Sequence, residues 1–535
     1  MVYYYMLKNF KINIDAHPKD PGDILPDLLN LDPQDILSWK IKSKSIDARK
    51  KNTVGIFVLY SFFLELKKRP AQSRRQKFTL EETDKPVHVN ERGFVCKNPL
   101  KPPIVVGFGP AGLFAALKLA EAGLNPVVFE RGKSVEDRVK DVEAFWNEGR
   151  LNVNSNVHFG EGGAGTFSDG KLTTRVKSPL SGEVLRCFYE NGAPEEILYL
   201  NKPHIGTDKL RGVISGIRKQ IENLGGKVNF SSRITDIITE NGKAVGLEID
   251  GGDSIYSDDI ILATGHSAND VYRMLIEKKV FVEPKSFAIG VRIEHPSEMI
   301  NKNQYGKYHR SNILGAASYQ LSYRDKYSGR GVYSFCMCPG GLVVGSSSEE
   351  STLVVNGMSY HSRNGNNSNS AIIVTVNPSD YGNEPLGALD YLHNWESRAF
   401  LEGGSDYNAP VQLAGDFLER NISTHLGDVE PTCPPGVRFG DLDACLPDYV
   451  TNPIRNALID FDRKIPGFAR RDAVLTGVET RTSAPMRITR SAETMESLNL
   501  RNLYPCGEGA GYAGGIMSAS IDGIKTALKI IEKYM

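Results

Sequence analysis

The stretch that decides the fold runs from residue 104 to residue 131 and begins Ile104-Val105-Val106-Gly107-Phe108-Gly109-Pro110-Ala111-Gly112. Its first three residues form an uncharged β-branched run, as in a central parallel strand that is covered on both faces. The first glycine allows a sharp turn, the second lets backbone approach a pyrophosphate, and the third lets the following helix pack closely on the strand. This spacing predicts the turn of a dinucleotide-binding unit.

The residues after this turn support the same prediction. A helix is expected from about Pro110 to Gly123, because proline favours the first helical turn and glycine favours the C-terminal end. Its N-terminus would offer free N–H groups and a positive dipole end to a phosphate. Glu130 closes the next strand, where a carboxylate can accept both hydroxyls of a ribose. A glycine turn alone would be weak evidence, but here the strand, helix, second strand and acid follow in the expected order.

The composition is that of an ordinary globular protein. The chain has 535 residues, of which 40% are hydrophobic and 24% are charged, so two or three domains are expected. The formal net charge of zero argues against nucleic acid or an anionic membrane as the main partner. The longest uncharged apolar stretch, residues 53–64, is shorter than the roughly 18 residues of a membrane span. No signal peptide is apparent, and seven scattered cysteines favour a reducing, cytoplasmic location, with an organelle left open.

The N-terminal part reads as a small α/β unit. Strands are expected near residues 7–14, 36–42 and 54–64, with a helix near 24–31 and a basic linker at 67–77. The basic turn at 44–51 could grip a phosphate or an RNA backbone, but a solvated connection between strands accounts for it better.

The middle of the chain, residues 287–475, lacks the parallel pattern and reads as a mixed α+β insertion. Residues 333–344 resemble a hairpin that turns at Pro339-Gly340-Gly341. Residues 363–370 are polar and of low complexity, so they are expected to form a surface loop.

Two further glycine-dense segments carry chemistry. Five glycines fall within eleven positions between Gly160 and Gly170, which suits backbone that runs against a flat ring system and turns its N–H groups toward it. A flexible surface loop is the alternative, but the interleaved Phe159 and Phe167 argue against full solvation. Near the C-terminus, a strand ends in Gly507-Glu508, and Gly514-Gly515-Ile516 then opens a helix. The N-terminus of that helix can stabilise negative charge on a reduced ring, which favours a flavin over a nicotinamide.

Several other residues are candidates for contact with a cofactor or substrate. A buried parallel strand ends in Ala263-Thr264-Gly265, where backbone can approach a nucleotide. His266 follows and could be an acid/base group or a turn residue, with neither favoured. Cys336 and Cys338 could be core residues, redox partners of a cofactor or metal ligands. No metal site is expected, because no second cysteine pair or histidine cluster completes the ligands.

Together these motifs resemble the glutathione-reductase-type FAD superfamily and, within it, a family of largely uncharacterised FAD-dependent dehydrogenases. The likeness to that family also covers Lys44-Ser45-Ile46-Asp47-Ala48-Arg49, residues 335–341 and residues 355–360. The resemblance implies an α/β fold in which a Rossmann-like discontinuous FAD-binding domain, at 101–286 and 476–535, encloses an inserted α+β substrate domain at 287–475. A small N-terminal α/β domain with its basic linker would occupy residues 1–85.

The resemblance also implies which residues hold non-covalent FAD. The pyrophosphate would lie on the first glycine turn, the adenosine ribose on Glu130, and the flavin along the second and third glycine-dense segments. The full set is Gly107, Gly109, Pro110, Ala111, Gly112, Glu130, Arg131, Gly162, Gly163, Ala164, Gly165, Thr166, Ser168, Ala263, Thr264, Gly265, Gly507, Glu508, Gly514, Gly515 and Ile516. The superfamily usually has Gly-Asp where this chain has Gly507-Glu508, which lengthens the reach of the acid by one methylene.

The expected function is that of an FAD-dependent oxidoreductase that passes hydride between a small-molecule substrate and FAD. Candidate catalytic residues, chosen by position, are His266, Cys336, Cys338 and Arg481, with Arg292 and Arg487 as further substrate-orienting candidates. No second GxGxxG follows a strand, so NAD(P)H or another electron partner would dock without a domain of its own. One alternative is a flavin-binding protein that acts with RNA through the basic N-terminal region. Another is a redox-inactive protein that keeps FAD only for folding.

Overall fold

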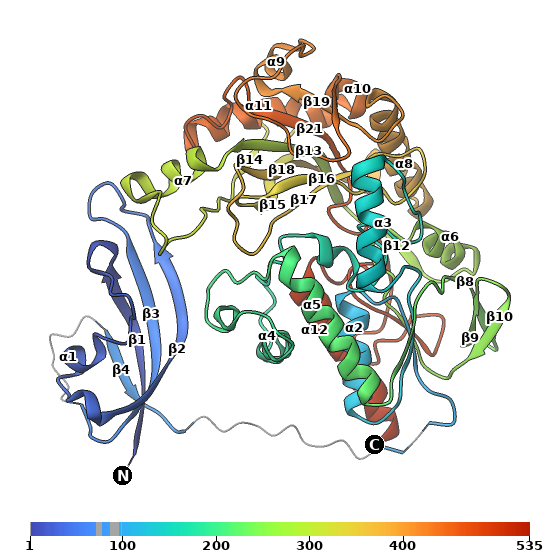
Figure 1. Ribbon diagram of the computed structural model, residues 1–535. Coiled ribbons are helices and arrows are strands. Elements are labelled where there is room, and N and C mark those ends of the chain that lie inside the picture. Colours follow the sequence, from blue (N-terminus) through green and yellow to red (C-terminus); the bar gives the residue numbers. More distant parts are fainter. Residues whose placement is uncertain (1, 71–77, 86–95, 98) are drawn as a thin grey trace.

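The computed structural model describes residues 2–70, 78–85, 96–97 and 99–535, and the chain has a mixed α/β fold (Figure 1). A five-stranded sheet in the order β23-β11-β5-β6-β7 is parallel throughout. Its strands are β5 (Ile104–Val106), β6 (Val127–Phe129), β7 (Lys227–Asn229), β11 (Ile260–Leu262) and β23 (Leu503–Pro505). The C-terminal strand β23 thus pairs beside strands from the first half of the chain, as the glycine motifs at both ends predict.

Helices α2 (Pro110–Glu121), α5 (Thr207–Asn223) and α12 (Ile516–Tyr534) lie side by side against this sheet (Figure 1). Two glycines set how closely α2 can approach its neighbours. A Cβ on Gly112 would lie 1.9 Å from the carbonyl oxygen of Gly107, and a Cβ on Gly523 would lie 2.1 Å from that of Ala111. The bounds of α2 and α12 confirm the helix expected after the first turn and the helix expected at the C-terminus.

A second layer shares its apolar core with β5 and β11. It consists of the antiparallel strands β8 (Ile234–Glu240), β9 (Lys243–Ile249) and β10 (Asp253–Tyr256) with helix α6 (Asn269–Glu277). Ile237, Leu247 and Leu275 from this layer are buried in one cluster with Ile104 and Leu262 of the parallel sheet. The short apolar strands β5 and β11 are therefore buried, as their uncharged sequences predict.

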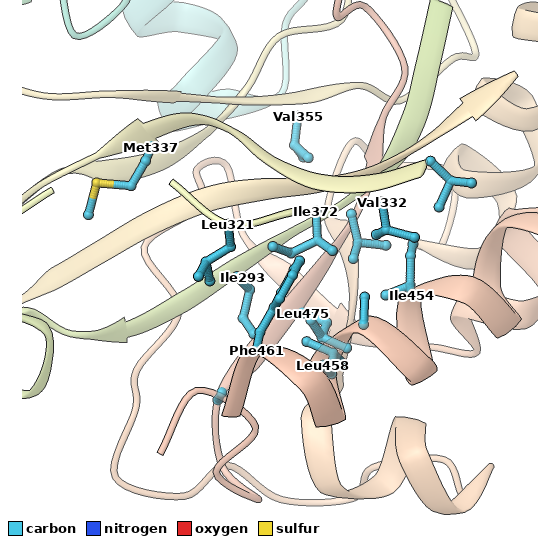
Figure 2. Close-up of a cluster of buried hydrophobic side chains, with 14 of the residues drawn as sticks. Ile293, Leu321, Val332, Met337, Val355, Ile372, Ile454, Leu458, Phe461 and Leu475 are labelled. Atoms are coloured by element: carbon cyan, nitrogen blue, oxygen red, sulfur yellow. The ribbon is translucent and has the colours of Figure 1, made fainter. Parts of the chain in front are cut away.

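A seven-stranded sheet in the order β14-β15-β18-β13-β21-β19-β20 dominates the middle of the chain. Its strands are β13 (Phe287–Pro296), β14 (Ser322–Arg324), β15 (Gly331–Cys338), β18 (Asn367–Val376), β19 (Ala409–Leu413), β20 (Val437–Phe439) and β21 (Val474–Glu479). Figure 2 shows Ile293, Ile372 and Leu475 of the sheet packed with Leu458 and Phe461 of helix α11 (Asp448–Lys464).

Shorter elements complete the fold around these layers. The pair β12 (Val282–Pro284) and β22 (Met486–Ile488) is antiparallel, as is the pair β16 (Leu342–Gly345) and β17 (Val355–Met358). The remaining helices are α3 (Val135–Glu148), α4 (Leu180–Glu190), α7 (Ser297–Tyr305), α8 (Pro385–Glu402), α9 (Ala414–Glu419) and α10 (Leu442–Cys445). None of the helices in the described part of the chain has the length and apolar character to cross a membrane.

The N-terminal residues form a four-stranded antiparallel sheet in the order β2-β3-β1-β4. Its elements are β1 (Tyr3–Asn13), α1 (Leu25–Leu29), β2 (Ile36–Asp47), β3 (Phe57–Leu66) and β4 (Thr79–Glu82). The three predicted strands and the helix are confirmed, while β4 was not predicted. The expected basic turn is partly wrong, since β2 runs on to Asp47 and the Lys44 backbone bonds to Tyr199 and Asn201. Residues 71–77 of the predicted linker lie outside the described residues.

Two predictions for the middle of the chain are wrong. The segment 333–344 is not a hairpin, because β15 pairs with β14 and β18 whereas β16 pairs with β17. The segment 363–370 is not all surface loop, because Asn367–Ser370 are buried at the start of β18. Several of their side chains form hydrogen bonds inside the protein. The Asn367 amide donates to Glu294 at 3.0 Å and the Ser368 hydroxyl accepts from the Gly340 N–H at 3.0 Å.

The contact between α2 and α12 can be tested by adding a single methyl group. Gly523→Ala should lower the free energy of unfolding by about 1–3 kcal/mol, because its Cβ has no room beside the Ala111 carbonyl. Gly212→Ala in α5 is the matched control, since a Cβ there meets no atom within 4 Å and alanine is the better helix former. Thermal unfolding of both variants gives the comparison. Equal melting temperatures for the two would contradict the close packing.

Candidate functional site

A cavity of about 630 Å³ lies where the carboxyl ends of β5, β6 and β11 open toward the seven-stranded sheet. This volume is within the range of small-molecule and cofactor sites, roughly 300–1,000 Å³. In open parallel sheets, ligands bind at the carboxyl ends of the strands. The opposite wall comes from β15, β17 and β21. The fold therefore places a ligand-sized space between the two sheets.

Two helices start at this cavity. Gly109 is the N-cap of α2 and Gly515 is the N-cap of α12, and neither cap makes a side-chain hydrogen bond. Their first N–H groups have no partner within the helix, and the positive ends of both helix dipoles lie there. A Cβ built on Gly265, Gly514 or Gly515 would meet no protein atom within 4 Å. These glycines leave open space beside partial positive charge, which fits an extended, flat and anionic ligand such as FAD.

Most of the predicted cofactor-binding residues line the cavity. They are Gly107, Gly109, Pro110, Ala111, Glu130, Arg131, Gly163, Ala164, Gly165, Ser168, Ala263, Thr264, Gly265, Glu508, Gly514, Gly515 and Ile516. Gly112, Gly162, Thr166 and Gly507 are not among the lining residues. They support the wall from behind, as when the Thr166 hydroxyl donates to the Glu161 carbonyl at 3.1 Å and the Gly507 N–H donates to Asp522 at 2.8 Å.

The glycine-rich segment is held in place by one buried arginine. Arg138 on α3 is fully buried, and its guanidinium donates to the carbonyl oxygens of Asn156, Val157 and Glu161 at 2.6–2.9 Å. A Cβ on Gly160 would lie 2.4 Å from the Arg138 side chain. Glycine is therefore required there for packing as well as for its backbone conformation, with φ at +119°.

Glu130 does more than the sequence predicts. Its Oε2 accepts the N–H of Phe108 at 2.7 Å, and its Oε1 accepts those of Gly132 and Gly160 at 2.9 Å each. The carboxylate thus joins the first glycine turn, the end of β6 and the glycine-rich segment. It also lines the cavity, and a carboxylate offers about four acceptor positions. A contact of Glu130 with a ribose stays a prediction, because a hydroxyl would share the carboxylate with three backbone groups.

Glu508 and His266 lie beside each other in the cavity wall. The Nδ1 of His266 is 3.6 Å from Oε1 of Glu508. Burial raises the pKa of Glu508 to about 7, and burial together with the nearby Arg481 lowers the pKa of His266 to about 4. His266 is therefore a neutral imidazole near pH 7. It can donate or accept a hydrogen bond at the cavity, but it carries no charge there.

Arg481 also lines the cavity, but its guanidinium is paired with a carboxylate of the protein. Its Nε and Nη2 each donate to a different carboxylate oxygen of Glu396 on α8, both at 2.7 Å. The pair is buried, and buried bidentate pairs of this kind hold elements together. Arg487, the other arginine of the predicted segment, is not among the lining residues; it is exposed and lies over the Tyr512 ring.

The two cysteines differ in their surroundings. Cys336 faces the cavity, whereas Cys338 is buried and its Sγ donates to the Cys336 carbonyl at 3.2 Å. Desolvation by the surrounding protein raises the pKa of Cys336 to about 12 and also raises that of Cys338. Both are therefore thiols, rather than thiolates, near neutral pH.

Arg292 lies behind these cysteines and is not among the residues that line the cavity. It is completely buried and donates to the Cys336 carbonyl at 2.7 Å and to Glu479 at 2.8 Å. Glu479 lines the cavity and was missed by the sequence analysis, as was Arg363. Asp169 and Lys171 also line the cavity. Their position in the glycine-rich segment is the one sequence feature that could have indicated a role at the site.

Several basic N-terminal residues form contacts within the protein. Arg49 donates to Asp47 at 2.7 Å, and Lys51 donates to the Asn303 carbonyl. Lys68 pairs with Asp35 at 2.8 Å, and Arg69 pairs with Glu82 at 3.1 Å. This arrangement lends no support to the RNA-binding alternative.

The anchoring role of Glu130 can be tested with an isosteric variant. Glu130→Gln should lower the free energy of unfolding by about 1–3 kcal/mol, because an amide NH₂ cannot accept, so at least one buried N–H loses its partner. Glu190→Gln at the exposed end of α4 is the control, and it should melt like the wild type. Thermal unfolding measures both. A Glu130→Gln protein that melts with the control would show that the three backbone bonds contribute little.

Comparison with known proteins places this chain in a family. Residues 286–482 match the family described as "FAD-dependent protein, C-terminal domain-like". An "Uncharacterized protein" of Clostridium beijerinckii is 50% identical over 507 residues, which cover 95% of this chain and 94% of that protein. Protein FixC of Escherichia coli strain K12 is 31% identical over 205 residues, which cover 37% of this chain and 44% of FixC.

Solved structures of low sequence identity are also similar. CtdE in complex with FAD matches with 12% identity and a TM-score of 0.34 over 81% of this chain and 84% of that chain. L-proline dehydrogenase from P. horikoshii matches with 13% identity and a TM-score of 0.34 over 82% of this chain and 95% of that chain. By its near full-length match, this chain belongs to the same family as the Clostridium beijerinckii protein, and its C-terminal domain type makes it an FAD-dependent protein.

Proposed function

We propose that this protein is an oxidoreductase in which hydride passes between a small-molecule substrate and non-covalent FAD. The observation that carries the proposal is the convergence of two uncapped helix N-termini, at Gly109 and Gly515, on one glycine-walled cavity. One helix end suits the diphosphate, and the other suits the negative charge of a reduced ring. FAD supplies the redox chemistry when bound, and the chain supplies position and electrostatics.

The proposal assigns FAD to the side of the cavity formed by the parallel sheet. Gly107 and Gly109 with the α2 N-terminus would hold the diphosphate, and Glu130 would lie at the ribose. Gly163–Gly165 and Gly514–Ile516 would flank the ring. The substrate would then enter between the ring and the seven-stranded sheet, where Glu479 and Cys336 line the wall.

We also propose that the FAD-binding domain is discontinuous, at 101–286 and 476–535, with the substrate domain inserted at 287–475. The pairing of β23 with β11 and of β22 with β12 supports this division. NAD(P)H or another electron partner would dock without a domain of its own. We also expect a reducing, cytoplasmic location, because the seven cysteines are free.

The assignment of the ring can be tested at a glycine that faces only open cavity. Gly514→Val should leave the stability of the apoprotein nearly unchanged, because a Cβ there meets no protein atom within 4 Å, but it should lower FAD occupancy at least tenfold by occupying the space of the ring. Gly182→Val on α4 is the control, since it is equally unobstructed but does not line the cavity. Bound flavin per protein, from visible absorbance, gives the result. Full FAD occupancy in Gly514→Val would contradict the assignment.

Hydride transfer itself can be tested by anaerobic reduction. The purified yellow protein should lose its flavin absorbance after mixing with NADH, NADPH or one of a panel of small alcohols, amines and hydroxy acids. Dithionite is the control for the total reducible flavin. A flavin that dithionite reduces but no biological donor reduces would favour the alternative of a protein that keeps FAD only for folding.

A further inference from the structure

The end of the cavity opposite the first glycine turn contains charges that the FAD site does not use. It is lined by Lys171 of the glycine-rich segment, Tyr319 before β14, Phe335 and Cys336 of β15, and Glu479 of β21. Apolar rings and ionisable groups therefore share one wall. The balance between those charges indicates what this end can bind.

Lys171 belongs to a group with one excess positive charge. Arg363 donates from Nε to Asp169 Oδ1 at 3.0 Å and from Nη2 to Oδ2, so the Asp169 carboxylate already has a bidentate partner. The Lys171 Nζ lies farther away, 3.6 Å from Asp169 Oδ2. Burial lowers the pKa of the neighbouring His204 to about 4, so this imidazole adds no charge at neutral pH. The group therefore contains two cations, Arg363 and Lys171, and one anion, Asp169. Its net charge of +1 lies at the cavity wall.

Glu479 sets the charge of the facing wall. Its Oε2 accepts from Arg292, whose other donors are directed to Asn356, Asn369 and the Cys336 carbonyl at 2.7–3.1 Å. The pair is neutral when Glu479 is ionised and carries one positive charge when Glu479 is protonated. Burial raises the pKa of Glu479 to about 7, while Arg292 and Lys171 both act to lower it.

The other ionisable groups that face Glu479 are uncharged. Cys336 and Cys338 of β15 are thiols, because desolvation by the surrounding protein raises the pKa of each. The charged neighbours of Glu479 are thus Arg292 from β13 and Lys171 from the glycine-rich segment. Below neutral pH, this end of the cavity carries two net positive charges, and above it one.

Two further cations line the cavity at its surface. Arg175 and Lys202 are both exposed lining residues, and the structure pairs neither of them with a carboxylate within the described ranges. Among the described residues, the Lys202 ammonium donates to the Ser318 hydroxyl alone, at 3.2 Å. Unpaired cations at the mouth of a cavity raise the local concentration of anions.

We propose that this end of the cavity binds a small organic carboxylate, with the Lys171 ammonium as its counter-charge and the protonation of Glu479 controlling its affinity. The proposal rests on the proposed function, because it identifies this ligand as the class of substrate that the FAD enzyme oxidises or reduces. The rings of Tyr319 and Phe335 and the Met337 side chain give the same wall an apolar part. An anion with a hydrocarbon body fits both features better than an inorganic ion does.

The test uses the FAD-loaded full-length protein with benzoate and its neutral counterpart benzamide as probes. Binding is followed by the change in flavin visible absorbance at pH 6 and pH 8. The Kd of benzoate should rise about tenfold between these pH values, because a single group of pKa about 7 loses its proton and repels the anion. Benzamide should bind at least tenfold more weakly than benzoate at pH 6, and its Kd should change little with pH.

Three variants separate the contributions. Lys171→Met should raise the benzoate Kd at least tenfold at pH 6 and leave benzamide unaffected. Glu479→Gln should bind benzoate with the same Kd at both pH values, since the amide has no proton to lose. Lys209→Met, at an exposed lysine of α5 away from the cavity, is the matched control and should keep the wild-type Kd values.

Each contrary result overturns the inference without affecting the proposed function. Benzoate that does not perturb the flavin of the wild-type protein, or that binds no better than benzamide, excludes a carboxylate site. Loss of FAD in Lys171→Met would assign the ammonium to the cofactor. A pH dependence that persists in Glu479→Gln would assign the titration to another group. The proposed function fails on a different observation, namely a wild-type protein that neither retains nor takes up FAD.

Discussion

The close contact between α2 and α12 is the constraint on which the cavity depends. Gly112 lets α2 lie against the Gly107 carbonyl, and Gly523 lets α12 lie against the Ala111 carbonyl. The two helices therefore start near one another, and both starts open into the same space. Each helix N-terminus carries a partial charge of roughly +0.5. Since neither has a side-chain cap, a bound anion would supply the missing partner for both.

The other wall depends on one buried side chain. The Arg292 guanidinium on β13 bonds to Cys336 on β15, Asn356 on β17, Asn369 on β18 and Glu479 on β21. A buried cation is unfavourable unless its donors are all satisfied, and here four strands supply the acceptors. The positions of Glu479 and of the Cys336 backbone are thus tied to a single residue. This explains how a wall built from distant segments keeps a defined shape toward the ligand.

Features that depend on neighbouring residues can be predicted from this sequence, whereas features that depend on distant residues cannot. The turn at Gly107, the helix after it and the helix after Gly515 depend on neighbours in the chain, and their predictions are confirmed. Strand β15 pairs with β14 and β18, which lie elsewhere in the chain. The local Pro-Gly-Gly sequence therefore predicts a hairpin that does not form. The sequence wrongly predicts Asn369 to lie at the surface. In the structure Asn369 is buried and accepts a hydrogen bond from Arg292, which is 77 residues away in the chain. Glu479 and Arg363 could not be found for the same reason.

The geometry of the cysteine pair favours a packing role over a redox role. Cys338 also lines the cavity, but it is buried and its Sγ–H donates to the Cys336 carbonyl. The bulge that exposes Cys336 gives this residue a positive φ of 42°. This conformation costs free energy in a residue with a Cβ. The bond from Arg292 to the Cys336 carbonyl offsets that cost. Because desolvation by the surrounding protein raises the pKa of both groups, they are thiols near neutral pH and neither is a ready nucleophile. Charge at this end of the cavity is therefore controlled by Lys171 and Glu479, and the Cys336 thiol offers a ligand only a weak hydrogen bond.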